Sequence, residues 1–368
     1  MMSIIIFFIV LGVLVLVHEL GHFVFAKKAG VQVDEFGFGF PPRLLTLGKK
    51  WGTVFTLNWI PLGGFVKIVG ENYEAPSLEE KNFGEPKEKM FTEVNKRWQA
   101  SILFAGVFFN FLFAWLLFAV GFSIGLPAPV DNNFGYSVQN PKLTIISVLK
   151  DSPSEIAGLK SGDKIIAVKD NKNIVDMLDV ENVSEFISKS EGVVEVEIER
   201  GKDTLNFSLA PEQNLSINRK IVGINMDMVG TLSLPIHRSI LEGGKVSAKL
   251  VYLTVDGLYN LIKDAFIGKA DFSSVTGPVG IVGMVGDASK LGFGYLLTFT
   301  ALISINLAVI NLVPIPALDG GRLLFVGIEA ITNRRIKPSI IGAVNSISFA
   351  LLIVLMLIVT YRDILKLF

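Results

Sequence analysis

The chain has no cysteine and only three histidines in 368 residues. It therefore forms no disulfide, thiolate metal site or catalytic thiol, and imidazole and carboxylate groups are the strong metal ligands that remain. Charge is also scarce, because 18% of the residues are charged, against about 25% in ordinary soluble domains. The 34 basic residues balance the 34 acidic ones. With no excess of positive charge, we expect no nucleic-acid partner.

Long apolar segments are abundant, since 51% of the residues are hydrophobic and the mean hydropathy is +0.53. A helix needs about 20 apolar residues to cross a bilayer. Four segments are long enough: residues 1–26, 99–130, 291–318 and 338–361. The first could instead be a signal peptide, but it lacks a basic start and contains a His-Glu pair. The sequence therefore predicts a polytopic α-helical membrane protein with four transmembrane helices.

Basic residues near the ends of these segments predict the orientation in the membrane. Positive charge gathers in cytoplasmic loops. Basic pairs follow the first segment, precede the second and lie between the third and fourth: Lys27 with Lys28, Lys96 with Arg97, and Arg334 with Arg335. We therefore expect residues 27–98 to be cytoplasmic. The N-terminus and the segment between the second and third spans are then extracytoplasmic.

The segment between the second and third spans alternates between apolar and polar residues, as β-strands do. Its Ser152-Pro-x-x-x-Ala157-Gly-Leu-x-x-Gly162-Asp motif resembles the PDZ domains of bacterial envelope proteases. We expect a single extracytoplasmic α+β PDZ domain at residues 135–212, which could bind a peptide as an added strand. A generic small β domain is the alternative. Residues 213–290 are predicted to be a linker and amphipathic helices near the membrane surface.

The first apolar segment contains His18-Glu19-Leu20-Gly21-His22, an H-E-x-x-H motif. On a helix, residues four apart share a face, so both imidazoles can hold one Zn²⁺ while Glu19 reaches the water beside it. The alternative is a polar contact between helices. Such groups cost several kcal/mol at membrane depth unless they are paired or bind a metal. The motif therefore favours a catalytic zinc site.

A catalytic zinc takes a third protein ligand and leaves one position open. The extended metzincin motif is excluded, because Phe25 and Lys28 stand where it requires Gly and His. Asp319 is the candidate, since it lies at the cytoplasmic end of the third segment, as the two histidines do in the first. Pro314 and Pro316 just before it break a helix, and irregular backbone at membrane depth is tolerated beside water. Alternatively, Asp319 caps the next helix.

These motifs together resemble the site-2 protease family of intramembrane zinc metalloproteases, of the bacterial regulator-of-sigma-E protease (RseP) type. The resemblance extends over Asn311-Leu-x-Pro-x-Pro-x-Leu-Asp319-Gly-Gly. It implies that His18, His22 and Asp319 bind Zn²⁺ and that Glu19 is the general base. It also implies that Asn311 and Asn306 hold the substrate near the metal. From the residues alone, these amides could equally be contacts between helices.

Two further segments resemble parts of this family. Residues 35–40 resemble its G-x-G loop, although Pro41 follows where a Gly-Pro pair is usual. Residues 51–67 resemble its β-hairpin-like loop that enters the membrane from the cytoplasmic side. An exposed strand edge there would stabilise an extended substrate, so Gly63 and Gly64 are expected to contact substrate. A cytoplasmic surface hairpin is the alternative.

The resemblance also implies a biological setting. We expect a multi-pass protein of the bacterial inner membrane whose active site faces the cytoplasm. Its substrates would be single-pass membrane proteins such as anti-sigma factors, or signal-peptide remnants, with a possible upstream site-1-type protease. Three alternatives remain: a membrane-anchored zinc protease for soluble substrates, a non-catalytic PDZ membrane scaffold, or an ion or metal transporter whose His and Asp mark the ion path.

Overall fold

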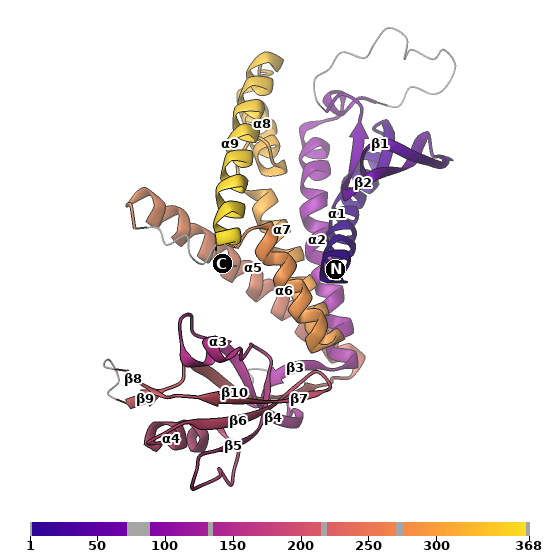
Figure 1. Cartoon of the computed structure of the whole chain (residues 1–368). Coiled ribbons are helices and arrows are strands. Elements are labelled where there is room, and N and C mark those ends of the chain that lie inside the picture. The colour runs from indigo at the N-terminus through magenta and orange to yellow at the C-terminus, as the bar shows by residue number, and fades with distance from the viewer. Residues whose placement is uncertain (1, 72–88, 132–134, 215–218, 270–275, 366–368) are drawn as a thin grey trace. The chain divides into compact units, whose positions relative to one another are not determined.

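The computed structural model describes residues 2–71, 89–131, 135–214, 219–269 and 276–365. Contacts between residues divide the chain into two units. The first unit comprises residues 1–118, 243–287 and 299–368, and the second comprises residues 119–242 and 288–298. The first is mainly helical and the second is mainly a β-sheet (Figure 1).

Four helices of the described chain are long and apolar enough to cross a membrane. They are α1 (Met2–Lys28), α2 (Lys96–Ile124), α7 (Phe293–Leu312) and α9 (Pro338–Leu365). Each overlaps one of the four apolar segments identified in the sequence. Only 6% of the most apolar window of α9 is buried inside the protein. An apolar helix with so little protein around it requires an apolar surrounding, which a bilayer supplies.

The helix predicted over 291–318 ends earlier than expected, because the break that the prolines predict already begins after Leu312. Helix α7 ends at Leu312, and α8 (Asp319–Thr332) begins after a break of six residues. Pro314 and Pro316 lie in this break and have no backbone N–H to donate. Leu318 N–H donates instead to Ile315 O at 2.8 Å. The break therefore brings Asp319 to the first turn of a new helix.

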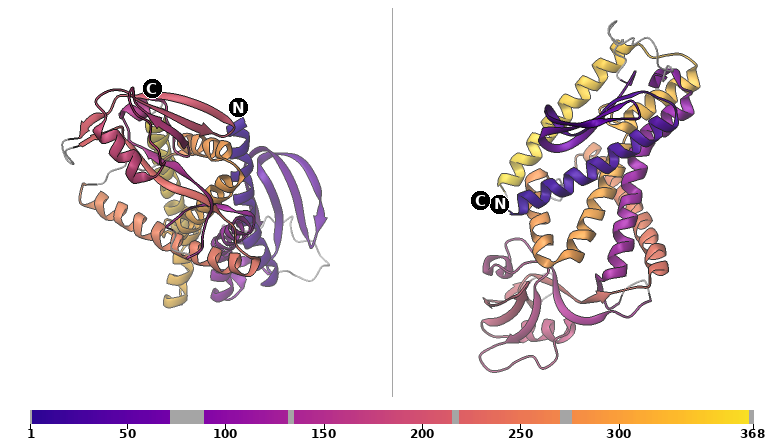
Figure 2. Two further views of the ribbon diagram at one scale, coloured as in Figure 1. Left: turned by 90° about the horizontal axis from the view of Figure 1, so that it is seen from below. Right: turned by 90° about the vertical axis from the view of Figure 1, so that its right-hand side faces the viewer.

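Strands β1 (Val33–Lys50) and β2 (Thr53–Ile68) form an antiparallel hairpin that begins well before the predicted residues 51–67. Each strand bends, so that residues 33–38 pair with 64–68 on one side and with 54–57 on the other. The expected G-x-G loop is thus a strand within this curled sheet. The segment 64–68 forms one edge, and both views of Figure 2 place the hairpin beside α1.

One apolar core joins α1, α2, β1 and α8 in the first unit. Phe23 of α1, Phe36 of β1 and Leu103 of α2 are buried in it, and Val326 of α8 packs into the same cluster. Burying large apolar side chains contributes about 1.5–3 kcal/mol each. This core therefore holds the start of α8 close to α1, although about 300 residues separate them in sequence.

The second unit contains a six-stranded antiparallel sheet with the order β3-β10-β4-β5-β6-β7. Its strands are β3 (Leu126–Pro129), β4 (Gln139–Val148), β5 (Lys164–Lys169), β6 (Val194–Arg200), β7 (Asp203–Leu209) and β10 (Ile224–Leu232). Two helices of this unit lie between β4 and β6 in the sequence, α3 (Pro153–Ala157) and α4 (Val180–Lys189). Within the predicted linker, β10 pairs with both β3 and β4, so the sheet extends past residue 212. The remaining elements of residues 213–290 are the two-stranded β8 (Glu212–Asn214) and β9 (Arg219–Ile221), then α5 (Ile236–Phe266) and α6 (Pro278–Leu291).

The residues of the predicted PDZ motif begin and end helix α3 and pair with strand β6. The Ser152 hydroxyl accepts a hydrogen bond from Glu155 N–H and caps α3. Gly158 ends that helix with φ of 93°, a conformation that glycine adopts without strain. Asp163 is fully buried and accepts hydrogen bonds from Arg200 Nε and Nη2, each 2.6 Å long. The motif thus specifies a capped helical turn that is tied to strand β6.

We expect Asp163→Ala to lower the free energy of unfolding of this sheet by about 2–4 kcal/mol, because it removes a two-pronged bond from a buried carboxylate. Hydrogen exchange of the amides in β5 and β6, measured on the full chain, would report the change. Asp176→Ala is the control, since this exposed aspartate should change stability by no more than about 0.5 kcal/mol. Equal protection in the two variants would contradict the prediction.

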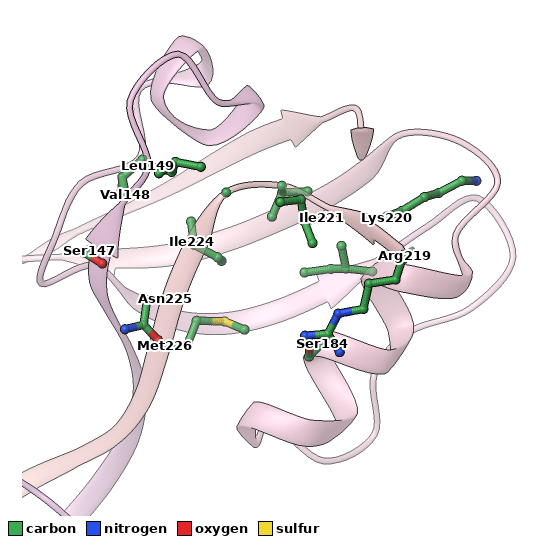
Figure 3. A pocket seen from close by; sticks show the side chains of 13 residues that line it. Ser147, Val148, Leu149, Ser184, Arg219, Lys220, Ile221, Ile224, Asn225 and Met226 are labelled. Atoms are coloured by element: carbon green, nitrogen blue, oxygen red, sulfur yellow. The ribbon is translucent and has the colours of Figure 1, made fainter. Parts of the chain in front are cut away.

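A groove of about 380 Å³ lies in the second unit between α4 and the start of β10 (Figure 3). Ser184 and Ile187 of α4 line one side, and residues 222–226 line the other. Figure 3 shows the Arg219 side chain reaching toward Ser184 at one end. Strand β3 pairs with β10 only over residues 229–232. In the described chain, residues 224–226 at the start of β10 therefore have no strand partner on the side of β10 that faces the groove.

Candidate metal centre

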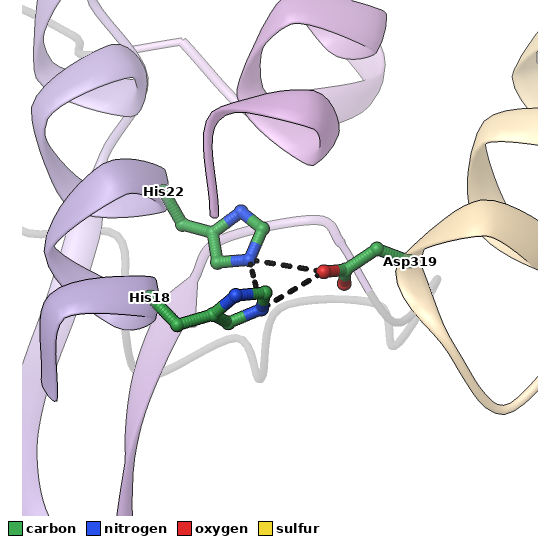
Figure 4. Close-up of side chains that lie close together, drawn as sticks. All are labelled: His18, His22 and Asp319. Atoms are coloured by element: carbon green, nitrogen blue, oxygen red, sulfur yellow. Dashed lines mark hydrogen bonds and ion pairs between the residues drawn. The ribbon is translucent and has the colours of Figure 1, made fainter. Parts of the chain in front are cut away.

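Three potential metal ligands meet between α1 and the start of α8. Figure 4 shows both imidazoles projecting from α1 toward the Asp319 carboxylate. The Nε2 atoms of His18 and His22 lie 3.2 Å apart. Asp319 Oδ2 is 2.9 Å from His18 Nε2 and 3.3 Å from His22 Nε2. Both histidines are buried, and the Asp319 side chain is 19% exposed.

This donor set fits a tetrahedral metal ion. Ligand atoms about 2.0–2.2 Å from a tetrahedral zinc ion lie about 3.3–3.6 Å from one another. The three separations of 2.9, 3.2 and 3.3 Å need to widen by only a few tenths of an ångström. Two neutral imidazoles and one carboxylate leave a fourth position free, as catalytic sites do. In the described residues, these three side chains are the one group of three or more His, Cys, Asp or Glu that meets the distance requirement for a metal site.

Two glycines allow α2 to approach the histidines closely. A Cβ atom added to Gly21 of α1 would overlap the backbone carbonyl of Ala105 in α2. A Cβ atom added to Gly106 of α2 would overlap the rings of both His18 and His22. The helices therefore touch backbone to backbone beside the metal site, which only small residues permit.

Helix α2 also supplies partners for the outer nitrogens of the two rings. His22 Nδ1–H donates to Ile102 O at 2.8 Å. A carbonyl oxygen only accepts, so in the neutral ring the proton of His22 is on Nδ1 and the lone pair of Nε2 faces the site. The corresponding nitrogen of His18 lies 3.2 Å from the side-chain amide of Asn110.

Glu19 lies between the two ligands on α1 and faces the β1–β2 sheet. Its carboxylate accepts a hydrogen bond from Val66 N–H in the edge segment 64–68. The charged groups that interact with it electrostatically include His22 and Asp319. Glu19 is therefore held beside the metal ligands and is in contact with the strand edge.

The chain matches the family model described as "Peptidase family M50" over residues 6–355. This match covers nearly the whole chain. The chain belongs to peptidase family M50. Membership of this family, the site-2 proteases, confirms the prediction made from the sequence motifs.

Individual relatives match over almost their full length. A Clostridium acetobutylicum protein named "Putative zinc metalloprotease" is 32% identical over 364 residues, which cover 98% of this chain and 97% of that protein. A Clostridium perfringens protein with the same type of name is 35% identical over 353 residues, or 95% of each chain. "Zinc metalloprotease RasP" of Geobacillus kaustophilus is 29% identical over 439 residues, covering 100% of this chain and 98% of RasP.

The family and the names of these relatives identify this peptidase as a zinc metalloprotease. M50 peptidases are embedded in membranes, and the four long apolar helices agree with a membrane protein. Membership of a peptidase family also disfavours the scaffold and transporter alternatives, because it accounts for the complete H-E-x-x-H motif.

Two ion pairs hold α8 of the peptidase in place. Arg322, one turn after Asp319, pairs with Glu71 at the end of the β1–β2 hairpin. Glu329, near the other end of α8, is buried and pairs with Lys96 at the start of α2. Removing one partner of a buried pair is costly. These pairs therefore restrain the helix that carries the third metal ligand.

The four residues predicted to bind substrate lie in different surroundings, and only one of them is shown next to Glu19. An added Cβ at Gly64 would lie 3.9 Å from Glu19 Cγ, so this residue is next to the predicted base. Gly63 instead faces Val15 of α1. Asn306 Oδ1 accepts a hydrogen bond from Thr254 of α5 at 3.1 Å, which is the contact between helices weighed as the alternative. Asn311 lies half-buried in the last turn of α7.

Two residues at the centre were not identified from the sequence. Gly106 and Asn110 are four positions apart in α2, so they lie on one face of the helix. This Gly-x-x-x-Asn spacing in an apolar segment was the available signal. By itself this spacing indicates only helix packing, because a glycine and an amide in a transmembrane segment commonly serve that purpose.

We expect Gly106→Ala to weaken metal binding and to destabilise the peptidase by about 1–3 kcal/mol, because the methyl group overlaps both imidazoles. Metal affinity and thermal unfolding in detergent would measure the two effects. Gly257→Ala in α5 is the matched control, since an added Cβ there meets open space. Alanine should raise helix stability at that position by up to about 1 kcal/mol. Equal metal affinity in both variants would contradict the prediction.

Proposed function

We propose that this zinc metalloprotease hydrolyses peptide bonds within or near transmembrane segments of membrane proteins. The observation that carries the proposal is the convergence of His18, His22 and Asp319, with 2.9–3.3 Å between their donor atoms. These ligands lie in a protein with four helices of membrane-spanning character. The zinc metalloprotease names of the relatives support the choice of metal.

His18, His22 and Asp319 would hold the zinc ion, and Glu19 would move the protons. A bound zinc ion supplies Lewis acidity, which polarises a carbonyl group and makes water nucleophilic near neutral pH. The Glu19 carboxylate takes a proton from the attacking water. It then returns that proton to the amine that leaves when the peptide bond breaks.

The edge of the β1–β2 sheet is proposed to receive the substrate. A peptide bond inside a helix is shielded by its own hydrogen bonds, so a transmembrane substrate must become extended before it is cut. Segment 64–68 pairs with residues 33–38 along one side, and an added strand could pair along the other. Val66 of this segment already contacts Glu19. A substrate strand bound there would therefore lie beside the predicted base.

We further propose the orientation that the basic residues favour. Lys27 and Lys28 end α1 just after the histidines, and Arg334 and Arg335 follow α8. By the positive-inside rule, these basic residues favour a cytoplasmic location for both ends. The metal centre would then open toward the cytoplasm of a bacterium, and the N-terminus and the sheet of the second unit would lie outside the inner membrane.

The groove in the second unit supports the proposal that this unit is a single PDZ domain. An extended peptide could pair with the start of β10, and Ile187 would contact its side chains. Candidate ligands are single-pass substrates of the anti-sigma-factor type or signal-peptide remnants. A new chain end, produced when an upstream site-1-type protease cuts the substrate, is a further candidate. The groove would recognise the substrate, and the metal centre would cut it.

Cleavage assays with two substrates would test the proposed function. The purified peptidase in detergent is expected to cut a single-pass transmembrane substrate and to leave casein intact. A chelator should abolish cutting, and zinc should restore it. Cutting of casein at a comparable rate would favour the membrane-anchored protease for soluble substrates. Absence of cutting with fully bound zinc would contradict a catalytic role.

A further inference from the structure

Asn110 of α2 is fully buried against His18. Its amide nitrogen lies 3.2 Å from His18 Nδ1. Its other amide atom, Oδ1, is buried and has no hydrogen-bond partner in the described part of the chain. Ser304 of α7 donates to the backbone carbonyl of Asn110 at 2.8 Å and fixes this turn of α2. A buried polar atom without a partner is rare in proteins and calls for an explanation.

The tautomer of a metal-binding histidine supplies that explanation. When Nε2 binds a metal, it does so through its lone pair, so the ring proton must be on Nδ1. That N–H then needs an acceptor, as in most metal-bound histidines. His22 has such an acceptor in Ile102 O. At His18 Nδ1, the structure places the amide of Asn110.

A half-turn of the Asn110 amide exchanges the positions of its oxygen and nitrogen. In the arrangement described, the amide N–H faces His18 Nδ1, which suits a ring whose proton is on Nε2 and points to Asp319. In the turned arrangement, Oδ1 faces Nδ1–H, which leaves Nε2 free for the ion. The amide therefore fits either tautomer of His18.

We propose that Asn110 is a positioning residue of the metal centre, whose Oδ1 accepts the hydrogen bond from His18 Nδ1–H when the ion binds. This inference rests on the proposed zinc site. Without an acceptor at this position, the buried N–H would be left unpaired and the ring would favour the tautomer that blocks Nε2. Changing such a partner commonly weakens metal binding about 10- to 100-fold.

The zinc dissociation constant of the purified full-length chain tests this proposal, measured by competition with a chelator in detergent. Asn110→Leu keeps the size of the side chain and removes the acceptor, so it should bind zinc about 10- to 100-fold more weakly. Asn110→Asp keeps an acceptor oxygen and should bind at least as tightly as the wild type. The control is Ser247→Ala, which removes another buried hydrogen-bonding side chain, in α5, and should leave the constant unchanged.

Nitrogen NMR of histidine provides a second readout, because the chain has only three histidines. With ¹⁵N-labelled histidine and bound zinc, His18 Nδ1 should give the signal of a protonated, hydrogen-bonded nitrogen in the wild type and in Asn110→Asp. In Asn110→Leu, that signal should lose its hydrogen-bonded shift. If Asn110 mattered only for packing, the hydrogen-bonded signal would not depend on whether the side chain offers an acceptor oxygen, as it does in Asn110→Asp.

The outcomes separate this proposal from the proposed function. If the wild type binds no zinc, the metal site itself is wrong. If the wild type binds zinc and Asn110→Leu binds it equally well, only the role of Asn110 is wrong. Should Asn110→Leu fail to fold, Asn110→Asp decides: wild-type affinity with a protonated Nδ1 supports the proposal, and weakened binding overturns it.

Discussion

Glu19→Gln is expected to lower the rate of peptide-bond cleavage by about 10²–10⁴-fold while zinc stays bound. Glutamine has the same shape but its amide does not take a proton from water or return one to the leaving amine. The ligands His18, His22 and Asp319 are untouched by the change. Cleavage of a single-pass membrane substrate and the zinc content of the same sample would measure both effects.

The matched control for this prediction is Glu93→Gln. Glu93 is an exposed residue before α2 whose carboxylate accepts a hydrogen bond from Met90 N–H, and glutamine can accept the same bond. Its cleavage rate and zinc content should equal those of the wild type. If Glu19→Gln cleaves as fast as Glu93→Gln, Glu19 is not the base and the proposed mechanism is wrong.

Asp319→Ala is expected to weaken zinc binding by more than about 100-fold and to abolish cleavage at ordinary zinc concentrations. Losing a ligand should cost more than losing a partner behind a ligand, which costs about 10- to 100-fold. The two imidazoles would remain, but two neutral ligands bind zinc weakly without the carboxylate. Chelator competition would give the affinity, and cleavage assays at rising zinc concentrations would show whether activity returns.

Asp256→Ala is the control, because it removes an exposed carboxylate from α5. Asp319→Asn adds a second comparison, since it keeps the shape of the side chain and loses the charge. We expect its zinc affinity to lie between those of the wild type and Asp319→Ala. Wild-type zinc affinity in Asp319→Ala would mean that another residue completes the site.

The two variants distinguish the parts of the centre. Glu19→Gln separates proton transfer from metal binding, whereas Asp319→Ala removes both metal and activity. In a protein that binds zinc for structural reasons alone, Asp319→Ala would lower the zinc affinity, but Glu19→Gln would change neither the zinc affinity nor the cleavage rate. The pair of results therefore tests catalysis and ligation independently.

Local patterns in the sequence predicted the parts of the molecule that local physics controls. The four apolar segments predicted four long helices, since length and hydropathy decide whether a helix can cross a bilayer. The spacing of His18 and His22 put both rings on one face of α1, because helical geometry fixes residues four apart. Pro314 and Pro316 predicted the interruption before Asp319, which ends α7 at Leu312.

Sequence patterns predicted the paired strands less well than the helices. The hairpin was predicted at residues 51–67, but β1 begins at Val33 and includes the supposed G-x-G loop. Residues 224–232 were assigned to a linker, but they form a strand in the sheet of the second unit. A strand is stabilised by its partners, and those partners can lie far away in the sequence.

The order of the amino acids supplies the reactive groups of this peptidase, which are two imidazoles, an adjacent carboxylate and a distant aspartate, and it supplies no thiol that could bind the metal instead. The packing of the helices sets which other groups surround these four side chains. Gly106 lets α2 touch both rings, and Asn110 meets the outer nitrogen of His18. These contacts join residues that are about 80 to 90 positions apart, and they depend on how closely two helices pack. Helical periodicity fixes the face on which a residue lies, but only packing fixes what that face meets.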